Sequence, residues 1–483
     1  MIKSNSITKN TSYLTLALTV QKIISFTYFT LLARNLGPES LGKYYFAISF
    51  TTIFALIIDM GLMNVLTREV AKKKEQAQQY LGNILTLKTP LLILCLLSVF
   101  VVINLLGYDE LTRHLVYISA SAMALDSFTT TFFAVTRSFH NLKYESAGAV
   151  GFQIIVMVLG LSALYQGAGL EWVMLAMLAG SLANFTYSWY VVRTKLKLKV
   201  KLLYNKKLAL TIIKIAIPFG IYILFNRTFL HIDSVLLSLL AGDKEVGLYQ
   251  IAFKIIFALQ FIPLAFIASF YPAMSFYWKN NKQQLALSFE RALKYLLIIS
   301  IPIAAGIFSI ADKVVLLFKD EFVASILPLQ IIIISTIFIF INFPIGSFLN
   351  ACDRQKQNTV NMGIVLAVSI IMNIILIPGY QAVGASITVL SANMVMTILG
   401  IYYVNKIIKF HRGRIIKLAF KALVAAVIMA VSIFYFKEYA NIFIVIISGG
   451  AIYFAFLFLF KALTVRDAAL AYGLLTNKKS FGE

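Results

Sequence analysis

The sequence predicts an all-α integral membrane protein with about fourteen transmembrane helices: two six-helix lobes in a parallel pseudo-repeat, followed by two C-terminal helices. Hydrophobic residues make up 60% of the 483 residues and charged residues 13%, and mean hydropathy is +0.85. Soluble domains carry roughly 25% charged residues. Long apolar runs recur along the whole chain, and one short sequence motif occurs twice.

Each apolar run is expected to form one helix. A helix needs about 20 residues to cross the hydrocarbon core, whereas barrel strands alternate in polarity and are about 10 residues long. The first run is too long for a signal peptide and lacks a cleavage site, so it is interpreted as the first helix. In chain order the runs lie at 12–33, 41–63, 84–106, 115–136, 146–165, 171–192, 209–240, 247–275, 289–312, 322–350, 359–378, 383–404, 418–436 and 441–460.

The basic residues indicate the orientation of the chain. Most of the 43 lysines and arginines fall in every second connection, counted from the N-terminus. The positive-inside rule therefore predicts a protein of the cytoplasmic (inner or cell) membrane with both termini in the cytoplasm. Attraction to anionic lipid headgroups accounts for the rest of the +23 net charge, so nucleic acid is not an expected partner and membrane lipids are.

The repeated motif indicates an internal duplication. LARNLGPESLGKYYFA (32–47) returns 205 positions later as LSLLAGDKEVGLYQIA (237–252). A period of this length suits two six-helix bundles, and six helices per bundle is an even number, so the two copies run parallel. The predicted divisions are a lobe at 1–193, a basic cytoplasmic linker at 194–208, a lobe at 209–405, and helices 13 and 14 with a cytoplasmic tail at 406–483.

The repeat aligns two pairs of glycines. Gly37 and Gly242 lie where the first helix of each lobe ends, and a tight external turn there favours glycine because it accepts positive φ. Gly42 and Gly247 open the next helix, where a small residue permits close helix approach. We interpret all four glycines as structural rather than as substrate ligands.

Six sequence segments, taken together, carry a family resemblance. They are ARNLGPESLGKYYFA, DMGLMNVLTREVAKKK, IDSVLLSLLAGDKEVGLYQIAFK, FYPAMS, LNACDRQKQNTVNMG and MNIILIPGYQAVGASI. In this combination they resemble the polysaccharide exporter, or O-antigen flippase, family of the multidrug/oligosaccharidyl-lipid/polysaccharide exporter superfamily. The resemblance implies movement of a polyprenyl-diphosphate-linked oligosaccharide from the inner to the outer leaflet by alternating access, with polysaccharide polymerase machinery as a candidate partner. It does not name the sugar.

The same offset places a cation in the middle of helix 1 and of helix 7. Lys22 aligns with Arg227, and each lies fifteen residues before its turn glycine, roughly 20 Å along the helix. A charge at that depth normally faces a wet cavity or a partner, so we predict a cationic cleft for a diphosphate. His231, one turn beyond Arg227, and Lys254 are candidates to extend the cleft, whereas Lys88 and Lys214 are expected to snorkel from helix ends.

Asp59, Asp126 and Asp233 are the carboxylates placed within the spans. They are candidates for binding a coupling proton or sodium ion, but pairing with the intramembrane cations is the commoner arrangement and the favoured interpretation. Helices 13 and 14 lie outside the repeat and are candidates for a lipid-facing groove that holds the polyprenyl tail.

Two other function classes are weighed. A membrane glycan polymerase or ligase needs catalytic groups in an external loop, but the expected external loops are short and hold no His, Cys or carboxylate constellation. A cation-coupled multidrug exporter favours a cavity lined by carboxylates, unlike the paired cations here. No GxxxxGK loop or metal-ligand spacing occurs, Cys95 and Cys352 are expected to be packing residues, and the sequence predicts neither enzymatic activity nor a cofactor.

Overall fold

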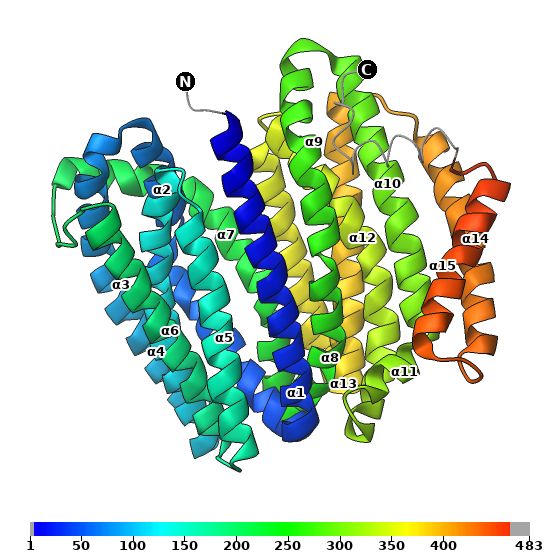
Figure 1. Ribbon diagram of the computed structural model, residues 1–483, viewed down its shortest axis with the longest axis horizontal. Coiled ribbons are helices and arrows are strands. Elements are labelled where there is room, and N and C mark those ends of the chain that lie inside the picture. Colours follow the sequence, from blue (N-terminus) through cyan, green and yellow to red (C-terminus); the bar gives the residue numbers. More distant parts are fainter. Residues whose placement is uncertain (1–3, 464–483) are drawn as a thin grey trace. The chain divides into compact units, whose positions relative to one another are not determined.

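The computed structural model describes residues 4–463, and within that range all regular structure is helical (Figure 1). The predicted tail beyond residue 463 lies outside the described residues. The elements are α1 (Ser4–Asp59), α2 (Leu62–Lys72), α3 (Ala77–Leu105), α4 (Glu110–Ser138), α5 (Lys143–Tyr165), α6 (Leu170–Tyr190), α7 (Lys206–Ala241), α8 (Asp243–Leu259), α9 (Phe261–Asn280), α10 (Lys282–Ser309), α11 (Ala311–Leu316), α12 (Ile326–Ala351), α13 (Gln355–Ile407), α14 (Arg412–Phe436) and α15 (Ile442–Leu459).

The helices match the predicted spans. Eleven segments among the described residues are long and apolar enough to cross a membrane. Two of them, Leu16–Asp59 and Gln355–Ile407, each contain two helices joined at a kink, and α6 adds a further helix of 21 residues. The all-α membrane fold with about fourteen spans is therefore confirmed.

The two kinks replace two predicted loops. In α1 the break is at Gly37, with φ 72° and ψ 174°, and Gly242 at the end of α7 has nearly the same conformation, φ 91° and ψ 168°. In α13 the break is at Gln381, a non-glycine residue with φ 49°. The Glu245 carboxylate accepts a hydrogen bond from the next backbone amide, Ala382 N, at 3.3 Å.

The sequence did not predict two helical features. The predicted basic connection after helix 2 contains α2, an amphipathic helix that buries Leu62, Val65, Leu66 and Val70. The predicted span 247–275 is divided into α8 and α9 at Gln260. A proline ring clashes with the carbonyl four residues earlier, and Pro263 therefore accounts for α8 ending at Leu259.

Backbone contacts group the chain into two compact units: one runs up to Lys254 and includes Met362–Thr388, and the other comprises Ile255–Asn361 and the chain from Val389 on. In the first unit, α2, α3 and α4 share an apolar core with Ile212 and Ala216 of α7. In the second unit, one core joins α9, α10, α12 and α13, and another joins α10, α14 and α15. The division into lobes at the linker stays a prediction.

The basic linker between α6 and α7 is bound to α3 of the first unit. Gln78 Oε1 accepts a hydrogen bond from Lys199 N at 2.7 Å, and its amide nitrogen donates to the Lys199 carbonyl. Asn83 Oδ1 accepts from Asn205 N at 2.7 Å, and Thr86 donates to the Leu203 carbonyl at 2.9 Å. The linker therefore lies along α3 as an extended segment.

Both cysteines are buried and unpaired. Cys352 lies between α12 and α13, and burial raises the pKa of its thiol to about 12. Both thiols therefore pack as small apolar groups.

Candidate functional site

The two copies of the repeated motif, residues 32–47 and 237–252, pack against each other within the first unit. A Cβ added to Gly42 would overlap the Asp243 carbonyl oxygen, and one added to Gly247 would overlap the Pro38 carbonyl oxygen. Pro38 and Asp243 are themselves 205 positions apart, as are Gly42 and Gly247. The contact is therefore reciprocal, as across a two-fold axis, and it joins the kink of α1 to the junction of α7 and α8.

Polar contacts surround this junction. Lys43, next to Gly42, bonds Asp109 at 2.7 Å, and Tyr108 is 2.8 Å from Ser238. Burial acts to raise the pKa of Asp109, but hydrogen bonds from Lys43 and Thr112 and the charge of Lys43 outweigh it, so this pKa lies below its usual value. The ion pair therefore stabilises the junction at neutral pH and loses that contribution as the pH falls through the lowered pKa.

Gly42→Ala and Gly247→Ala should each destabilise the protein, because the added methyl group meets a backbone carbonyl that cannot rotate away. We expect a loss of about 1–3 kcal/mol for each, as for overpacked cores, seen as a lower melting temperature of the purified protein. Gly151→Ala is the matched control, since Gly151 is a helical glycine with open space around it. Equal melting temperatures for all three variants would contradict the close contact.

Three of the predicted cleft residues lie together in the first unit. Arg227 and His231 lie one turn apart on α7, and Lys254 is on α8, where its ammonium lies 4.2 Å from the ring centre of Tyr45 on α1. His231 Nδ1 is 3.4 Å from Ser49 Oγ on α1. The structure thus brings these cationic and titratable groups to one place beside α1.

Aromatic side chains of α1 hold the Lys254 ammonium. Its Nζ lies 4.2 Å from the centre of the Tyr45 ring and 6.0 Å from that of Phe29, and these two rings meet edge to face at 5.7 Å. Cation–π contacts of this kind partly offset the desolvation of the ammonium. The sequence interpretation missed both rings, because aromatic residues are common in membrane helices and their spacing does not mark them.

Lys22 lies half-buried on α1, in the same unit. Arg227 is exposed on α7. The relation between these two cations through the repeat stays a prediction, as does their role in binding.

Asp59 pairs with Lys88. The Lys88 side chain is fully buried, and its ammonium donates to the Asp59 carboxylate, to the Ser127 carbonyl at 2.7 Å and to Ser127 Oγ at 2.9 Å. The prediction that Lys88 snorkels is wrong, because the lysine side chain finds a carboxylate and two further acceptors on α1 and α4. Pairing with Lys22 or Arg227 was the expected alternative for Asp59.

Asp233 is buried among neutral donors. Its carboxylate accepts hydrogen bonds from Asn373 Nδ2 at 2.6 Å, Tyr249 OH at 3.1 Å and Ser369 Oγ at 3.3 Å. The second amide atom, Asn373 Oδ1, is buried and has no hydrogen-bond partner among the residues that the structure describes. The amide thus turns its nitrogen toward Asp233 and leaves its oxygen unpaired. Asp126 lies half-buried on α4.

A bundle of membrane-length helices that contains an internal repeat and intramembrane charges is typical of a transporter. Comparison with known proteins supports this class. Residues 7–278, more than half of the chain, match the family described as polysaccharide biosynthesis protein, and residues 208–377 match the MatE family. The chain belongs to the polysaccharide biosynthesis protein family.

Several known proteins are similar to most of the chain. The probable low-salt glycan biosynthesis flippase Agl15 of Haloferax volcanii is 23% identical over 87% of each chain. The capsular polysaccharide biosynthesis protein CapF of Staphylococcus aureus is 22% identical over 83% of this chain and 99% of its own. The structure of lipid II flippase MurJ in an inward closed conformation aligns with a TM-score of 0.77 at 15% identity, covering 94% of this chain and 99% of its own.

Proposed function

We propose that this transporter is a flippase that moves a polyprenyl-diphosphate-linked oligosaccharide from the inner to the outer leaflet of the cytoplasmic membrane by alternating access. The observation that carries the proposal is the group of Arg227, His231 and Lys254 in the first unit, where His231 and Lys254 meet neighbouring turns of α1. Lys22 joins this group through the repeat. Both termini lie in the cytoplasm, and the product supplies cell-surface polysaccharide synthesis.

The chemistry of the group suits a diphosphate. A cation within the bilayer costs at least about 2.5–3.5 kcal/mol, so it persists where it meets water, a partner or an anion. The Arg227 guanidinium can bind two phosphate oxygens at once, whereas the ammonium groups of Lys22 and Lys254 act as point charges. The polyprenyl tail stays in lipid along helices 13 and 14, which are α14 and α15.

The membrane potential supports export. Moving an anion out of a negative interior is favoured by about 2.3 kcal/mol per charge per 100 mV. A diphosphate therefore needs no nucleotide-driven step, and a coupling ion is an addition rather than a requirement.

The proposal is tested in cells that lack the protein. Extracted lipids are identified by mass spectrometry, and an impermeant glycan-modifying enzyme applied to right-side-out vesicles assigns their leaflet. We expect a complete lipid-linked oligosaccharide to accumulate where the enzyme cannot reach it. Accumulation in the outer leaflet would favour a polymerase or ligase, and no accumulation would favour a drug exporter.

The match of residues 208–377 to the MatE family favours a second candidate, a cation-coupled exporter. Asp233 is the candidate cation-binding residue for either function, because its buried carboxylate lies beside Asn373, whose amide oxygen has no hydrogen-bond partner among the described residues. Carboxylate and amide oxygens are ligands of hard cations.

Asp233→Asn should remove any dependence of transport on a sodium or proton gradient while the fold persists, since asparagine keeps the shape and loses the charge. Transport is measured in proteoliposomes with each gradient present and absent. Asp320→Asn is the control, because it removes an exposed carboxylate that is not among the candidate coupling residues, and it should leave the dependence unchanged. Gradient dependence that survives in Asp233→Asn would exclude this residue from coupling.

A further inference from the structure

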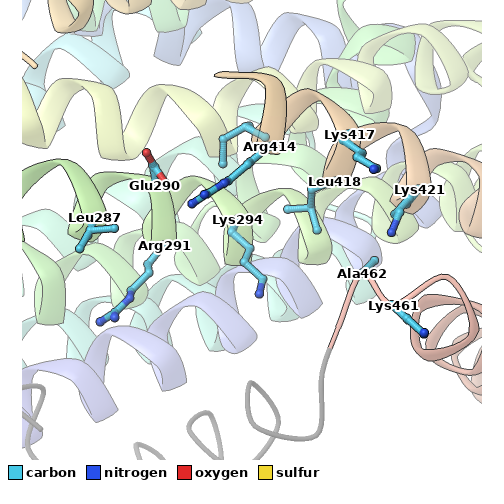
Figure 2. A pocket seen from close by; sticks show the side chains of 11 residues that line it. Leu287, Glu290, Arg291, Lys294, Arg414, Lys417, Leu418, Lys421, Lys461 and Ala462 are labelled. Atoms are coloured by element: carbon cyan, nitrogen blue, oxygen red, sulfur yellow. The ribbon is translucent and has the colours of Figure 1, made fainter. Parts of the chain in front are cut away.

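A strongly basic pocket lies in the second unit, where the beginnings of α10 and α14 meet the end of α15 (Figure 2). Its volume is about 310 Å³. Six of its eleven lining residues are lysine or arginine and only one is acidic. The lining comprises Arg291, Lys294, Arg414, Lys417, Lys421, Lys461, Glu290, Leu287, Ile415, Leu418 and Ala462.

Helical spacing concentrates this charge. Arg414, Lys417 and Lys421 follow one another at intervals of three and four residues on α14, and Arg291 and Lys294 are three apart on α10. Like charges at such spacing repel one another. Figure 2 shows side chains from both helices and from the end of α15 around one hollow. Its charge therefore favours an anion.

The lining does not neutralise itself. The Glu290 carboxylate interacts with His411 outside the lining: its Oε1 accepts a hydrogen bond from the His411 backbone amide at 2.7 Å and lies 3.1 Å from His411 Nδ1. Lys421 donates to the neutral Phe460 carbonyl at 2.5 Å. Within residues 4–463, no ion pair engages Arg291, Arg414, Lys417 or Lys461, which are four of the six cations.

The surroundings point to a lipid rather than to a soluble anion. Leu287, Ile415 and Leu418 line the pocket beside the cations. Further along α14, Phe420 and Leu423 are 65% and 49% exposed, as expected for a helix that faces hydrocarbon. Basic pockets between membrane helices at the cytoplasmic side suit lipid headgroups.

We propose that this pocket binds the phosphate group of a membrane lipid. The headgroup lies among Arg291, Arg414 and Lys417, and the chains run beside the apolar face of α14. The lipid is either an anionic phospholipid of the bilayer or a polyprenyl diphosphate, which share this phosphate chemistry. The site lies in the second unit, whereas Lys22, Arg227 and Lys254 lie in the first.

The test measures lipid binding to the full-length protein by native mass spectrometry, with phosphatidylglycerol, a polyprenyl diphosphate and phosphatidylcholine as separate probes. Arg414→Gln/Lys417→Gln should weaken binding of at least one anionic probe by about tenfold or more, since each cation near the site contributes to attraction. Both side chains are exposed, so the melting temperature should stay that of the unaltered protein.

Lys197→Gln/Lys199→Gln is the matched control, because it removes two charges from the basic linker of the first unit. If the Arg414→Gln/Lys417→Gln variant binds only phosphatidylglycerol more weakly, the pocket holds a bilayer phospholipid. If it binds only the polyprenyl diphosphate more weakly, the pocket holds the substrate lipid. Either result supports the site. Equal weakening by the control pair, or equal binding of phosphatidylcholine, overturns it. The readout is binding rather than transport, so a failure here leaves the proposed flippase intact.

Discussion

Replacing Lys22 and Arg227 together by glutamine should reduce flipping of the lipid-linked oligosaccharide by about a hundredfold or more. Each charge-assisted hydrogen bond contributes about 1.5–3 kcal/mol, and 1.4 kcal/mol is a tenfold change. Arg227→Lys should fall between the double variant and the unaltered protein, since lysine keeps the charge and loses the bidentate geometry. Flipping is measured by access of an impermeant glycan-modifying enzyme to vesicles.

The control variant removes two charges from α7, the helix that carries Arg227. Lys206 and Lys207 form the exposed first turn of α7, and Lys206→Gln/Lys207→Gln should leave the transport rate close to that of the unaltered protein. If the Lys22/Arg227 double variant folds and transports at full rate, the cationic cleft is excluded.

Asp59→Leu should be the most destabilising substitution of the buried ion pair. Among the described residues, it leaves the ammonium of the fully buried Lys88 with the two Ser127 oxygens and the Phe128 ring, 5.9 Å away, as partners. Removing one partner of a buried pair costs about 3–5 kcal/mol. Lys88→Met should cost less, because the Asp59 carboxylate is 28% exposed and can recruit water. Thermal unfolding of the purified protein measures both.

The double variant Asp59→Leu/Lys88→Met distinguishes the pair from a general packing effect. With both charges removed, stability should recover much of the loss seen in Asp59→Leu, since no uncompensated charge remains. If the two single losses simply add in the double variant, the ion pair does not account for the effect.

The membrane class could be predicted from sequence because hydropathy is a local property. A run of about 20 apolar residues specifies a helix whatever surrounds it, and the predicted runs therefore coincide with observed helices such as α4, α7 and α12. The amphipathic helix α2 escaped prediction because its stripe of four buried residues is short and mixed with charges.

The prediction of the candidate site depended on the repeat and identified only some of the residues that the structure brings together. An offset of 205 positions relates Lys22 to Arg227, and simple helical spacing places His231 near Arg227. It does not find Tyr45 and Phe29, which meet Lys254 from another helix. Residues that are distant in sequence and unrelated by the repeat leave no pattern to read.

By itself, the sequence determined the all-α membrane class, the approximate number of spans and the internal repeat, because composition, run length and self-similarity need no knowledge of partners. The tertiary structure decided which buried group meets which. It set Lys88 against Asp59, Asn373 against Asp233, and the helix starts at Gly42 and Gly247 against each other. It also gathered Arg291, Arg414 and Lys461 around one pocket. These choices depend on which helix faces pack together, because a buried charge or a close backbone contact is stable only where a second segment supplies its complement.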